Sequence, residues 1–285
     1  MRNVILKRTA ALKNTLFRRP SSSGANNPER RFFVIGSQKS GTTWLRDCLD
    51  EFVPFCKSEW YYPQLLSGVE SHFERFGFSL PEDKRRETVR RIGAEVWKAL
   101  NGDAMGEKSA YPCSEVVGPI HPHIHTRAVS KTREYFPGAR IAVIVRDPRA
   151  VFNSLRHYVD HFRDGASRDL DPRSFAETWA DQNLAWVRQS PDVVVRYEQL
   201  KTDFENTLQD ALSNLGLDHA PDAIARVRAH VYDINGLRPR QPEIYRTGTV
   251  DEWRRKLEPE IAGIILDFAA PAMTEIGYDL SLDQA

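Results

Sequence analysis

Short apolar runs alternate along the chain with longer segments whose apolar residues recur at helical spacing. Three runs rich in β-branched and aromatic residues predict buried strands, at residues 31–35, 139–145 and 192–196. A fourth, brief strand is predicted within residues 103–112. Strands that are apolar throughout, rather than alternating, are typical of a parallel sheet that is covered on both faces.

Helical spacing of apolar residues fills most of the intervening sequence. Helices are predicted at residues 44–49, 81–100, 204–212 and 260–273, and another begins at Pro148. A Ser-x-x-Glu capping box predicts a further helix start at Ser174. Strands alternating with helices predict an α/β fold of three layers, α/β/α, around a central and mostly parallel sheet.

Polar residues cluster at the predicted strand ends. Lys39, Glu107, Arg146 and Tyr197 each fall just beyond a predicted strand. Open parallel sheets bind ligands outside the carboxyl ends of their strands. We therefore expect these four side chains to belong to one site.

The first strand runs into a glycine-bearing loop and then directly into a helix. Such a loop directs backbone N–H groups and the positive end of the helix dipole at one point, which suits an anion. Gly36 and Gly41 have the separation of the two P-loop glycines, but Thr42 stands where the phosphate-binding lysine of a P-loop would be. The lysine is Lys39, inside the loop, where it suits a donor with one terminal transferable group better than a nucleoside triphosphate.

Residues 38–44, Gln-Lys-Ser-Gly-Thr-Thr-Trp, resemble the phosphosulfate-binding loop of the sulfotransferase family, usually written PKSGTTW. Gln38 replaces the proline. The resemblance implies a P-loop-like fold and a donor, 3′-phosphoadenosine 5′-phosphosulfate (PAPS), which leaves as adenosine 3′,5′-bisphosphate. It assigns donor binding in this segment to Ser37, Gln38, Lys39, Ser40, Gly41, Thr42, Thr43 and Trp44.

A second segment, Arg146-Asp147-Pro148 followed by Ser154, resembles the family's motif for the 3′-phosphate. An arginine fork and a hydroxyl, eight residues apart, are suited to converge on one phosphate. The alternatives are a salt bridge of Arg146 with Asp147 or another acid, and a helix-surface role for Ser154.

Two further segments resemble the family less closely. Tyr197 lies in a segment like the family's YEDL, whose tyrosine is near the adenine, and the resemblance also implies that Trp44 stacks on that base. Burial in the core is the alternative for both rings. Residues 246–254 resemble the segment RKGxxGxW, which implies 3′-phosphate contacts from Arg246, Thr247 and Gly248, although Thr247 stands in place of the lysine.

Sulfuryl transfer needs a cation at the leaving phosphate and a base for the acceptor. We predict Lys39 as that cation. Glu107-Lys108-Ser109 resembles the Glu-Lys-[Ser/Thr] segment of heparan-type sulfotransferases, which implies Glu107 as the base, with a structural salt bridge as the alternative. A histidine among the alternately spaced His121, His123 and His125, which could share one strand face, is the other candidate base, and we predict that no metal is required.

Composition limits the class of protein. The 285 residues carry a net charge of +1, so no global basic field indicates nucleic acid as a partner. No apolar run approaches the ~20 residues of a membrane span. Three cysteines without metal spacing indicate reduced thiols and a cytoplasmic location.

The first 28 residues carry six basic residues and no acidic one. We predict that residues 1–28 form a disordered basic tail, with a transit peptide or a membrane-surface arm as alternatives, and that residues 29–285 form one domain.

Taken together, the sequence predicts a PAPS-dependent sulfotransferase that acts by direct in-line transfer on a hydroxyl or amine of a carbohydrate or small-molecule acceptor. A small-molecule kinase and a non-catalytic nucleotide-binding protein are the alternatives. The sequence does not indicate the acceptor or the oligomeric state.

Overall fold

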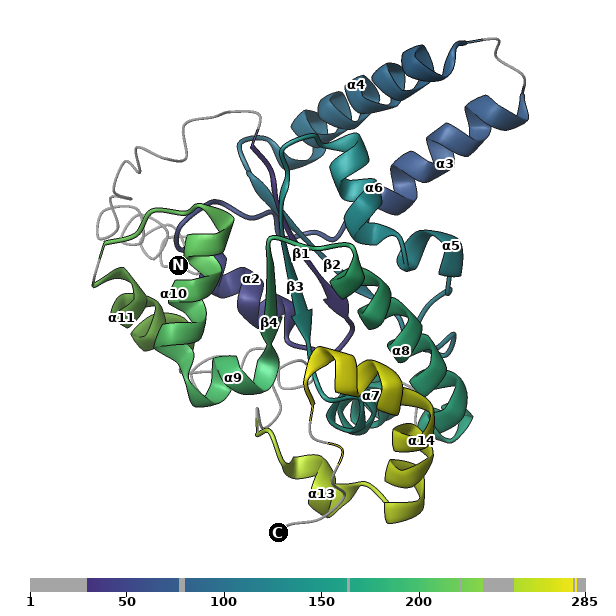
Figure 1. Cartoon of the computed structure of the whole chain (residues 1–285), viewed down its shortest axis with the longest axis vertical. Helices are drawn as coiled ribbons and strands as arrows, with labels where there is room; N and C mark the ends of the chain where they lie inside the picture. The colour runs from purple at the N-terminus through teal and green to yellow at the C-terminus, as the bar shows by residue number, and fades with distance from the viewer. Residues whose placement is uncertain are drawn as a thin grey trace, which may run out of the picture.

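The computed structural model describes residues 30–76, 80–162, 165–220, 222–232, 249–278 and 280. At its centre lies a four-stranded sheet in the order β2-β1-β3-β4, and all neighbouring strands are parallel (Figure 1). The strands are β1 (Phe32–Ser37), β2 (Gly106–Tyr111), β3 (Arg140–Val145) and β4 (Val193–Arg196). The four predicted strands are thus confirmed, although the tail predicted at residues 1–28 lies outside the described residues.

Alternate residues of β1 serve two different hydrophobic cores. All six residues of β1 are buried. Phe32 and Val34 point to one face of the sheet and pack in one cluster, whereas Phe33 and Ile35 pack in the cluster on the other face. A strand that is buried on both faces reads as one continuous apolar run, which is why the sequence pattern located it.

Helices cover both faces and produce the predicted three layers (Figure 1). On the Phe32 face lie α2 (Thr42–Asp50), α9 (Tyr197–Thr202), α10 (Phe204–Leu215) and α11 (Ala223–Val227), followed by the π-helical turn η2 (Arg228–Tyr232). The helix α10 ends at Gly216, whose φ of 65° is the left-handed conformation that favours glycine at a C-cap.

The opposite face carries the larger cluster. Its helices are α3 (Tyr62–Arg75), α4 (Glu82–Asn101), α5 (Pro122–His125), α6 (Ala128–Tyr135), α7 (Pro148–Phe162), α8 (Pro172–Arg188) and α14 (Pro259–Ile276). Two short elements, η1 (Ala166–Asp169) and α13 (Glu252–Lys256), complete the set that the structure describes. Paired α3 and α4 project from the body as a hairpin (Figure 1).

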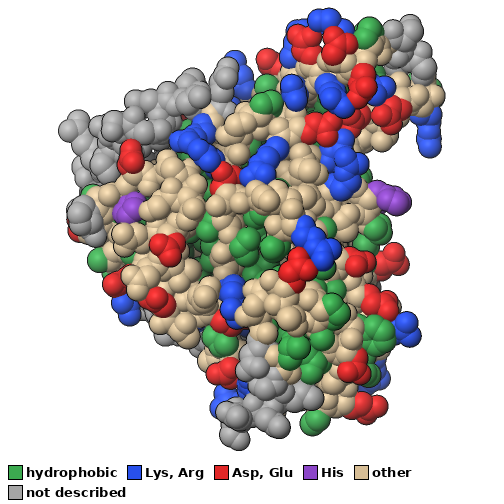
Figure 2. Space-filling model, in the orientation of Figure 1, with side chains coloured by type: hydrophobic (Ala, Val, Ile, Leu, Met, Phe, Trp, Pro, Cys, Tyr) green, Lys and Arg blue, Asp and Glu red, His purple; other side chains and the backbone are tan. Residues whose placement is uncertain are grey.

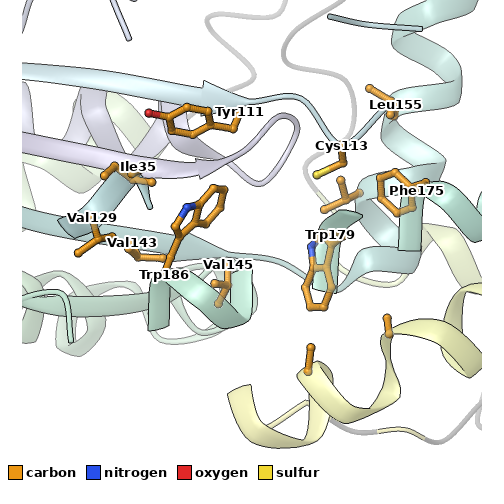
Figure 3. Packing of buried hydrophobic residues seen from close by; sticks show 14 of the residues in the cluster. Ile35, Tyr111, Cys113, Val129, Val143, Val145, Leu155, Phe175, Trp179 and Trp186 are labelled. Carbon is orange, nitrogen blue, oxygen red and sulfur yellow. The ribbon is translucent and has the colours of Figure 1, made fainter. Parts of the chain in front are cut away.

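Tryptophans from the helices fill the core on this face. Trp97, Trp179 and Trp186 are completely buried. In Figure 3, Trp186 of α8 lies beside Ile35 and Val143 of the sheet. Burying an aromatic side chain stabilises the fold by roughly 1.5–3 kcal/mol, so these three rings hold α4 and α8 firmly on the sheet.

One predicted helix start is wrong. Helix α8 begins at Pro172, and its N-cap is Asp171, whose carboxylate accepts hydrogen bonds from the backbone N–H groups of Arg173 and Ser174. Ser174 is therefore inside the first turn rather than the cap. An aspartate before a proline is a better start signal than the capping box, because the proline ring is already set for the first helical position.

A basic recess lies at the amino ends of the strands, away from the predicted site. It has a volume of about 490 Å³ and is lined by Arg30, Arg133, Pro137, Gly138, Ala139, Arg140 and Asp192. Asp192 forms ion pairs with Arg133 at 3.2 Å and with Arg140 at 2.6 Å. Lys and Arg side chains gather over this end of the molecule (Figure 2).

Two general features complete the fold. Cys48, Cys56 and Cys113 form no disulfide. Within the described part of the chain, every helix is too short or too polar to cross a bilayer.

Candidate functional site

The loop between β1 and α2 has the shape of an anion-binding turn. In this loop the backbone N–H of Ser40 donates to the carbonyl oxygen of Ser37 at 3.1 Å, and this hydrogen bond closes the turn. Lys39 and Gly41 both have positive φ, of 67° and 92°. A non-glycine residue in this conformation costs of order 1–3 kcal/mol, and such strain concentrates at functional sites.

Two glycines are sterically required at this junction. A Cβ on Gly36 would lie 2.7 Å from the carbonyl oxygen of Ile144, and one on Gly41 would lie 2.5 Å from Cδ2 of Tyr197. The first contact brings β1 close to β3, and the second brings the loop close to the end of β4. The loop is therefore held against β3, which ends just before Arg146, and against Tyr197 at the end of β4.

A buried amide anchors the loop from beneath. Asn183 of α8 donates through Nδ2 to Ser37 Oγ at 2.9 Å, and both residues are fully buried. Sequence reasoning did not find Asn183, because a polar residue inside an amphipathic helix carries no signal of a partner 146 residues away.

The predicted catalytic lysine faces helix α7. Nζ of Lys39 lies 4.5 Å from the centre of the Tyr158 ring, and the lysine is half-buried. A cation over an aromatic face is attracted by roughly 0.5–2 kcal/mol. This contact directs the ammonium over the loop toward the helix that carries Ser154.

Arg146 lies at the centre of the site. Its Nη1 donates to the carbonyl oxygen of Lys39 at 3.0 Å, and its Nη2 donates to the carbonyl oxygen of Thr249 at 3.5 Å. Its guanidinium lies 4.2 Å from the ring centre of Tyr197. The predicted alternative, a pair with Asp147, is not formed: Asp147 binds Arg149 in a fork instead, with a shortest contact of 2.7 Å.

The two predicted adenine-stacking residues contact each other. Trp44 and Tyr197 meet edge to face with ring centres 5.6 Å apart, and Phe204 stacks on Trp44 at 6.0 Å. The exposed fractions are only 3% for Trp44 and 5% for Tyr197. Both rings thus support the loop and Arg146 from the core, and stacking on a base stays a prediction.

Among the residues that the structure describes, several buried polar atoms of this site lack a hydrogen-bond partner, including Gln38 Oε1, Ser40 Oγ and Arg146 Nε. Leaving such groups unsatisfied costs about 1–3 kcal/mol each, and native proteins rarely do so without a reason. The hydroxyl and the guanidinium are donors suited to phosphate oxygens. Ser154, predicted together with Arg146 for the 3′-phosphate, is half-buried on α7.

The predicted base Glu107 is not at a strand end. It is the second residue of β2, opposite Phe33 of β1, and it is completely buried. Burial raises the pKa of this carboxyl to about 7, although hydrogen bonds from Trp60, Ser109 and Tyr61 act in the other direction. The prediction that Glu107 lies beyond its strand is therefore wrong, while its role as the base stays a prediction.

Glu59 is an acidic residue that sequence reasoning passed over. Its carboxylate pairs with Nζ of Lys108, and Lys108 in turn donates to Thr43 Oγ1 at 3.2 Å, so Glu59 is two contacts from the first turn of α2. The Glu59 side chain is 30% exposed. The available signal was its position directly before the aromatic run at residues 60–62.

Comparison with known proteins agrees with this geometry. The sequence profile described as the Sulfotransferase family matches residues 31–221, about two thirds of the chain. The chain belongs to the sulfotransferase family. A comparison with curated protein sequences gives no match.

Solved structures with the same fold are distant in sequence. The mouse sulfotransferase SULT7A1, complexed with PAP, has a TM-score of 0.53 and 17% identity over 86% of this chain and 85% of its own. The sulfotransferase domain of the Synechococcus PCC 7002 olefin synthase has a TM-score of 0.53 and 18% identity over 94% and 100%. Retinol dehydratase, in complex with androsterone and the inactive cofactor PAP, has a TM-score of 0.51 and 14% identity over 89% and 82%. At these identities the likeness shows the fold.

The candidate histidines of this sulfotransferase do not form one face of a strand. Helix α5 begins directly after His121, so His121 and His123 are exposed while His125 is buried. Burial lowers the pKa of His125 to about 4, which keeps it neutral. In the described part of the chain, no group of three or more His, Cys, Asp or Glu side chains is arranged to hold a metal ion.

The third predicted segment of the sulfotransferase is described only in its second half. Arg246, Thr247 and Gly248 lie outside the described residues. Beyond them Trp253 is buried, and the guanidinium of Arg149 lies 4.1 Å from its ring centre. This contact fixes the end of the segment against the start of α7.

Proposed function

We propose that this sulfotransferase uses PAPS as its donor and moves the sulfuryl group directly to a hydroxyl or amine. The observation that carries the proposal is the hydrogen bond from Arg146 to the carbonyl oxygen of Lys39. This bond joins the loop after β1 to the residue that follows β3. The two segments predicted to bind the phosphosulfate and the 3′-phosphate therefore lie at the same edge of the sheet. A donor with anionic groups at the 3′ and 5′ positions of one ribose needs two such binding groups close together.

The unpartnered donors suit this nucleotide. Within the described part of the chain, Ser40 Oγ and Arg146 Nε are buried without hydrogen-bond partners, and each could donate a charge-assisted hydrogen bond to a phosphate oxygen. We assign the phosphosulfate end to the loop from Ser37 to Thr43 with the N-terminus of α2, and the 3′-phosphate to Arg146 and Ser154. When bound, the donor supplies an activated sulfuryl group on a phosphate leaving group.

Lys39 meets the charge that forms in the reaction. As the acceptor oxygen or nitrogen bonds to sulfur, the bond from sulfur to the bridging phosphate oxygen breaks, and that oxygen keeps the electron pair. An ammonium aimed at this oxygen stabilises the transition state more than the ground state. The positive φ of Lys39 and its contact with Tyr158 hold the ammonium at the loop before the donor binds.

A base must take the proton from the acceptor, and we propose the carboxylate of Glu59. Glu59 is partly exposed and is connected through Lys108 to Thr43, whereas Glu107 has no exposed surface. A general base has to reach its proton within hydrogen-bond distance or through one water. Activity of Glu59→Gln and of Glu107→Gln tests both assignments.

For the acceptor we propose a small molecule or carbohydrate that carries a hydroxyl or amine. Trp60 is 37% exposed beside Glu59, so it offers an aromatic face to such a molecule, whereas Tyr62 is fully buried against Trp97. Among proteins of this fold, retinol dehydratase has been crystallised with androsterone. This ligand favours including alcohols with an apolar carbon skeleton among the candidate acceptors.

The experiment is transfer from sulfur-labelled PAPS to a panel of acceptors without added metal, with products identified by mass. Labelled product that requires both PAPS and Lys39 supports the proposal. Transfer of phosphate from ATP with Mg²⁺ would support a kinase instead. Nucleotide binding with no transfer to any acceptor would support a non-catalytic role.

A further inference from the structure

The segment from Phe55 to Tyr61 covers the free edge of the sheet. β2 is an outer strand, and Phe55 forms an isolated parallel bridge with its first residue, Gly106. The backbone N–H of Cys56 donates to the carbonyl oxygen of Gly106 at 2.9 Å. A sheet edge has unpaired N–H and C=O groups that need partners, and this segment supplies some of them.

Two carboxylates complete the attachment reciprocally. Glu107 of β2 accepts, through Oε1, the backbone N–H groups of Trp60 at 3.0 Å and of Tyr61 at 3.2 Å. Glu59 of the segment accepts, through Oε2, the backbone N–H of Ala110 of β2 at 3.2 Å. A carboxylate of each segment thus accepts hydrogen bonds from backbone N–H groups of the other.

Glu107 is fully committed to this attachment. Besides the two amides, both of its oxygens accept a hydrogen bond from Ser109 Oγ, at 3.2 and 3.0 Å. The residue has no exposed surface. The amides that it binds belong to the turn that starts helix α3, where Tyr61 has a positive φ of 49°. A non-glycine residue holds this conformation only when surrounding contacts fix it.

We propose that Glu107 is a positioning residue: by holding the backbone of Trp60 and Tyr61, it sets the carboxylate of Glu59 beside Lys108 at the first turn of α2. This inference rests on the proposed function, because it gives Glu59 the proton transfer and Glu107 none. The hydrogen bonds that hold the backbone of Trp60 and Tyr61 can nevertheless be tested apart from the reaction, because they form without substrate.

Hydrogen exchange of the substrate-free protein tests the attachment directly. In Glu107→Ala the amides of Trp60 and Tyr61 should exchange about tenfold faster than in the wild type, because each loses its hydrogen-bond acceptor. Glu107→Gln keeps an oxygen at the same position and should keep most of the protection. Asp192→Asn is the matched control, because Asp192 also accepts a backbone N–H, that of Ile141, but at the other end of the sheet.

Activity then separates positioning from proton transfer. We expect Glu107→Gln to retain most of kcat and Glu107→Ala to lose about tenfold or more, with KM for PAPS little changed. Glu59→Gln should lose kcat while exchange at residues 60 and 61 stays as in the wild type.

Three results would overturn the inference. One is wild-type exchange in Glu107→Ala. The second is a loss of kcat in Glu107→Gln as deep as in Glu59→Gln with normal exchange, which would make Glu107 the base. The third, decisive if Glu107→Ala does not fold, is full loss of protection in Glu107→Gln. Absence of any transfer by the wild type would instead refute the proposed function and leave the exchange result standing.

Discussion

Nη1 of Arg146 donates to the carbonyl oxygen of Lys39 at 3.0 Å, which joins residues 107 positions apart in the sequence. The contact links the end of β3 to the loop that follows β1. These two strands are neighbours and parallel, so their carboxyl ends meet at the same edge. Lys39, predicted at the 5′-phosphosulfate, and Arg146, predicted at the 3′-phosphate of the same nucleotide, are therefore parts of one cluster.

Replacing Lys39 tests the electrostatic part of the mechanism. Lys39→Ala should lower kcat by about 10²–10³-fold, as loss of a preorganised donor to a developing charge does. The KM for PAPS should change far less. Lys57→Ala is the control, because Lys57 is exposed and pairs with Asp50 at 3.2 Å. Steady-state kinetics that show a changed KM with unchanged kcat would assign Lys39 to binding alone.

Replacing Arg146 tests the site for the 3′-phosphate. Arg146→Ala should weaken binding of adenosine 3′,5′-bisphosphate by about 10–100-fold, since a hydrogen bond to a charged group contributes roughly 1.5–3 kcal/mol. Binding of adenosine 5′-phosphate, which lacks that group, should stay nearly constant. Arg133→Ala in the recess at the other end of the sheet is the control. Equal losses for both nucleotides in calorimetry would contradict the assignment.

Gly41 tests the packing that brings the loop against Tyr197. In Gly41→Ala a Cβ would meet the Tyr197 ring at 2.5 Å, in a backbone conformation that itself costs about 1–2 kcal/mol for an L-residue. We expect a lower free energy of unfolding and weaker nucleotide binding. Gly68→Ala is the matched control: Gly68 lies inside α3 with nothing within 4 Å of its Cβ, so alanine should stabilise by about 0.5–1 kcal/mol. Urea unfolding measures the stability of both variants. Equal changes in the free energy of unfolding would contradict the close packing of the loop against Tyr197.

The buried carboxyl of Glu107 makes stability depend on pH. Burial raises its pKa from 4.5 to about 7, so between these values the folded protein holds a proton that the unfolded chain has lost. The free energy of unfolding therefore falls as pH rises through this window. Relative to Glu107→Gln, the wild type should lose on the order of 3 kcal/mol between pH 4.5 and pH 7.5. If urea unfolding gave the same dependence of the free energy of unfolding on pH for the two proteins, Glu107 would not titrate in this pH range.

The sequence predicted the features that depend on residues close together in the chain. The strand at residues 31–35 is apolar throughout, and the loop after it needs glycine at Gly36 and Gly41 for contacts within a few ångströms. Both signals are complete within one short stretch of chain. The position of Arg146 followed in turn from the rule that parallel strands end at the same edge.

The features that it missed depend on partners far apart in sequence. Strand β2 reads Gly-Glu-Lys-Ser-Ala-Tyr, which lacks the apolar pattern of a buried strand, so its polar residues were expected beyond its end. Its glutamate and lysine are buried because Trp60, Tyr61 and Glu59 provide their partners. Nothing local to residues 106–111 indicates those contacts, and the same holds for Asn183 beneath the loop.

Titration calorimetry of the wild-type protein, with adenosine 3′,5′-bisphosphate and separately with ATP and Mg²⁺, tests the proposed donor most directly. We predict that the bisphosphate binds at least tenfold more tightly, because only it carries a phosphate for Arg146 as well as one for the loop. Equal affinities, or tighter binding of ATP, would contradict the proposal that this site holds PAPS.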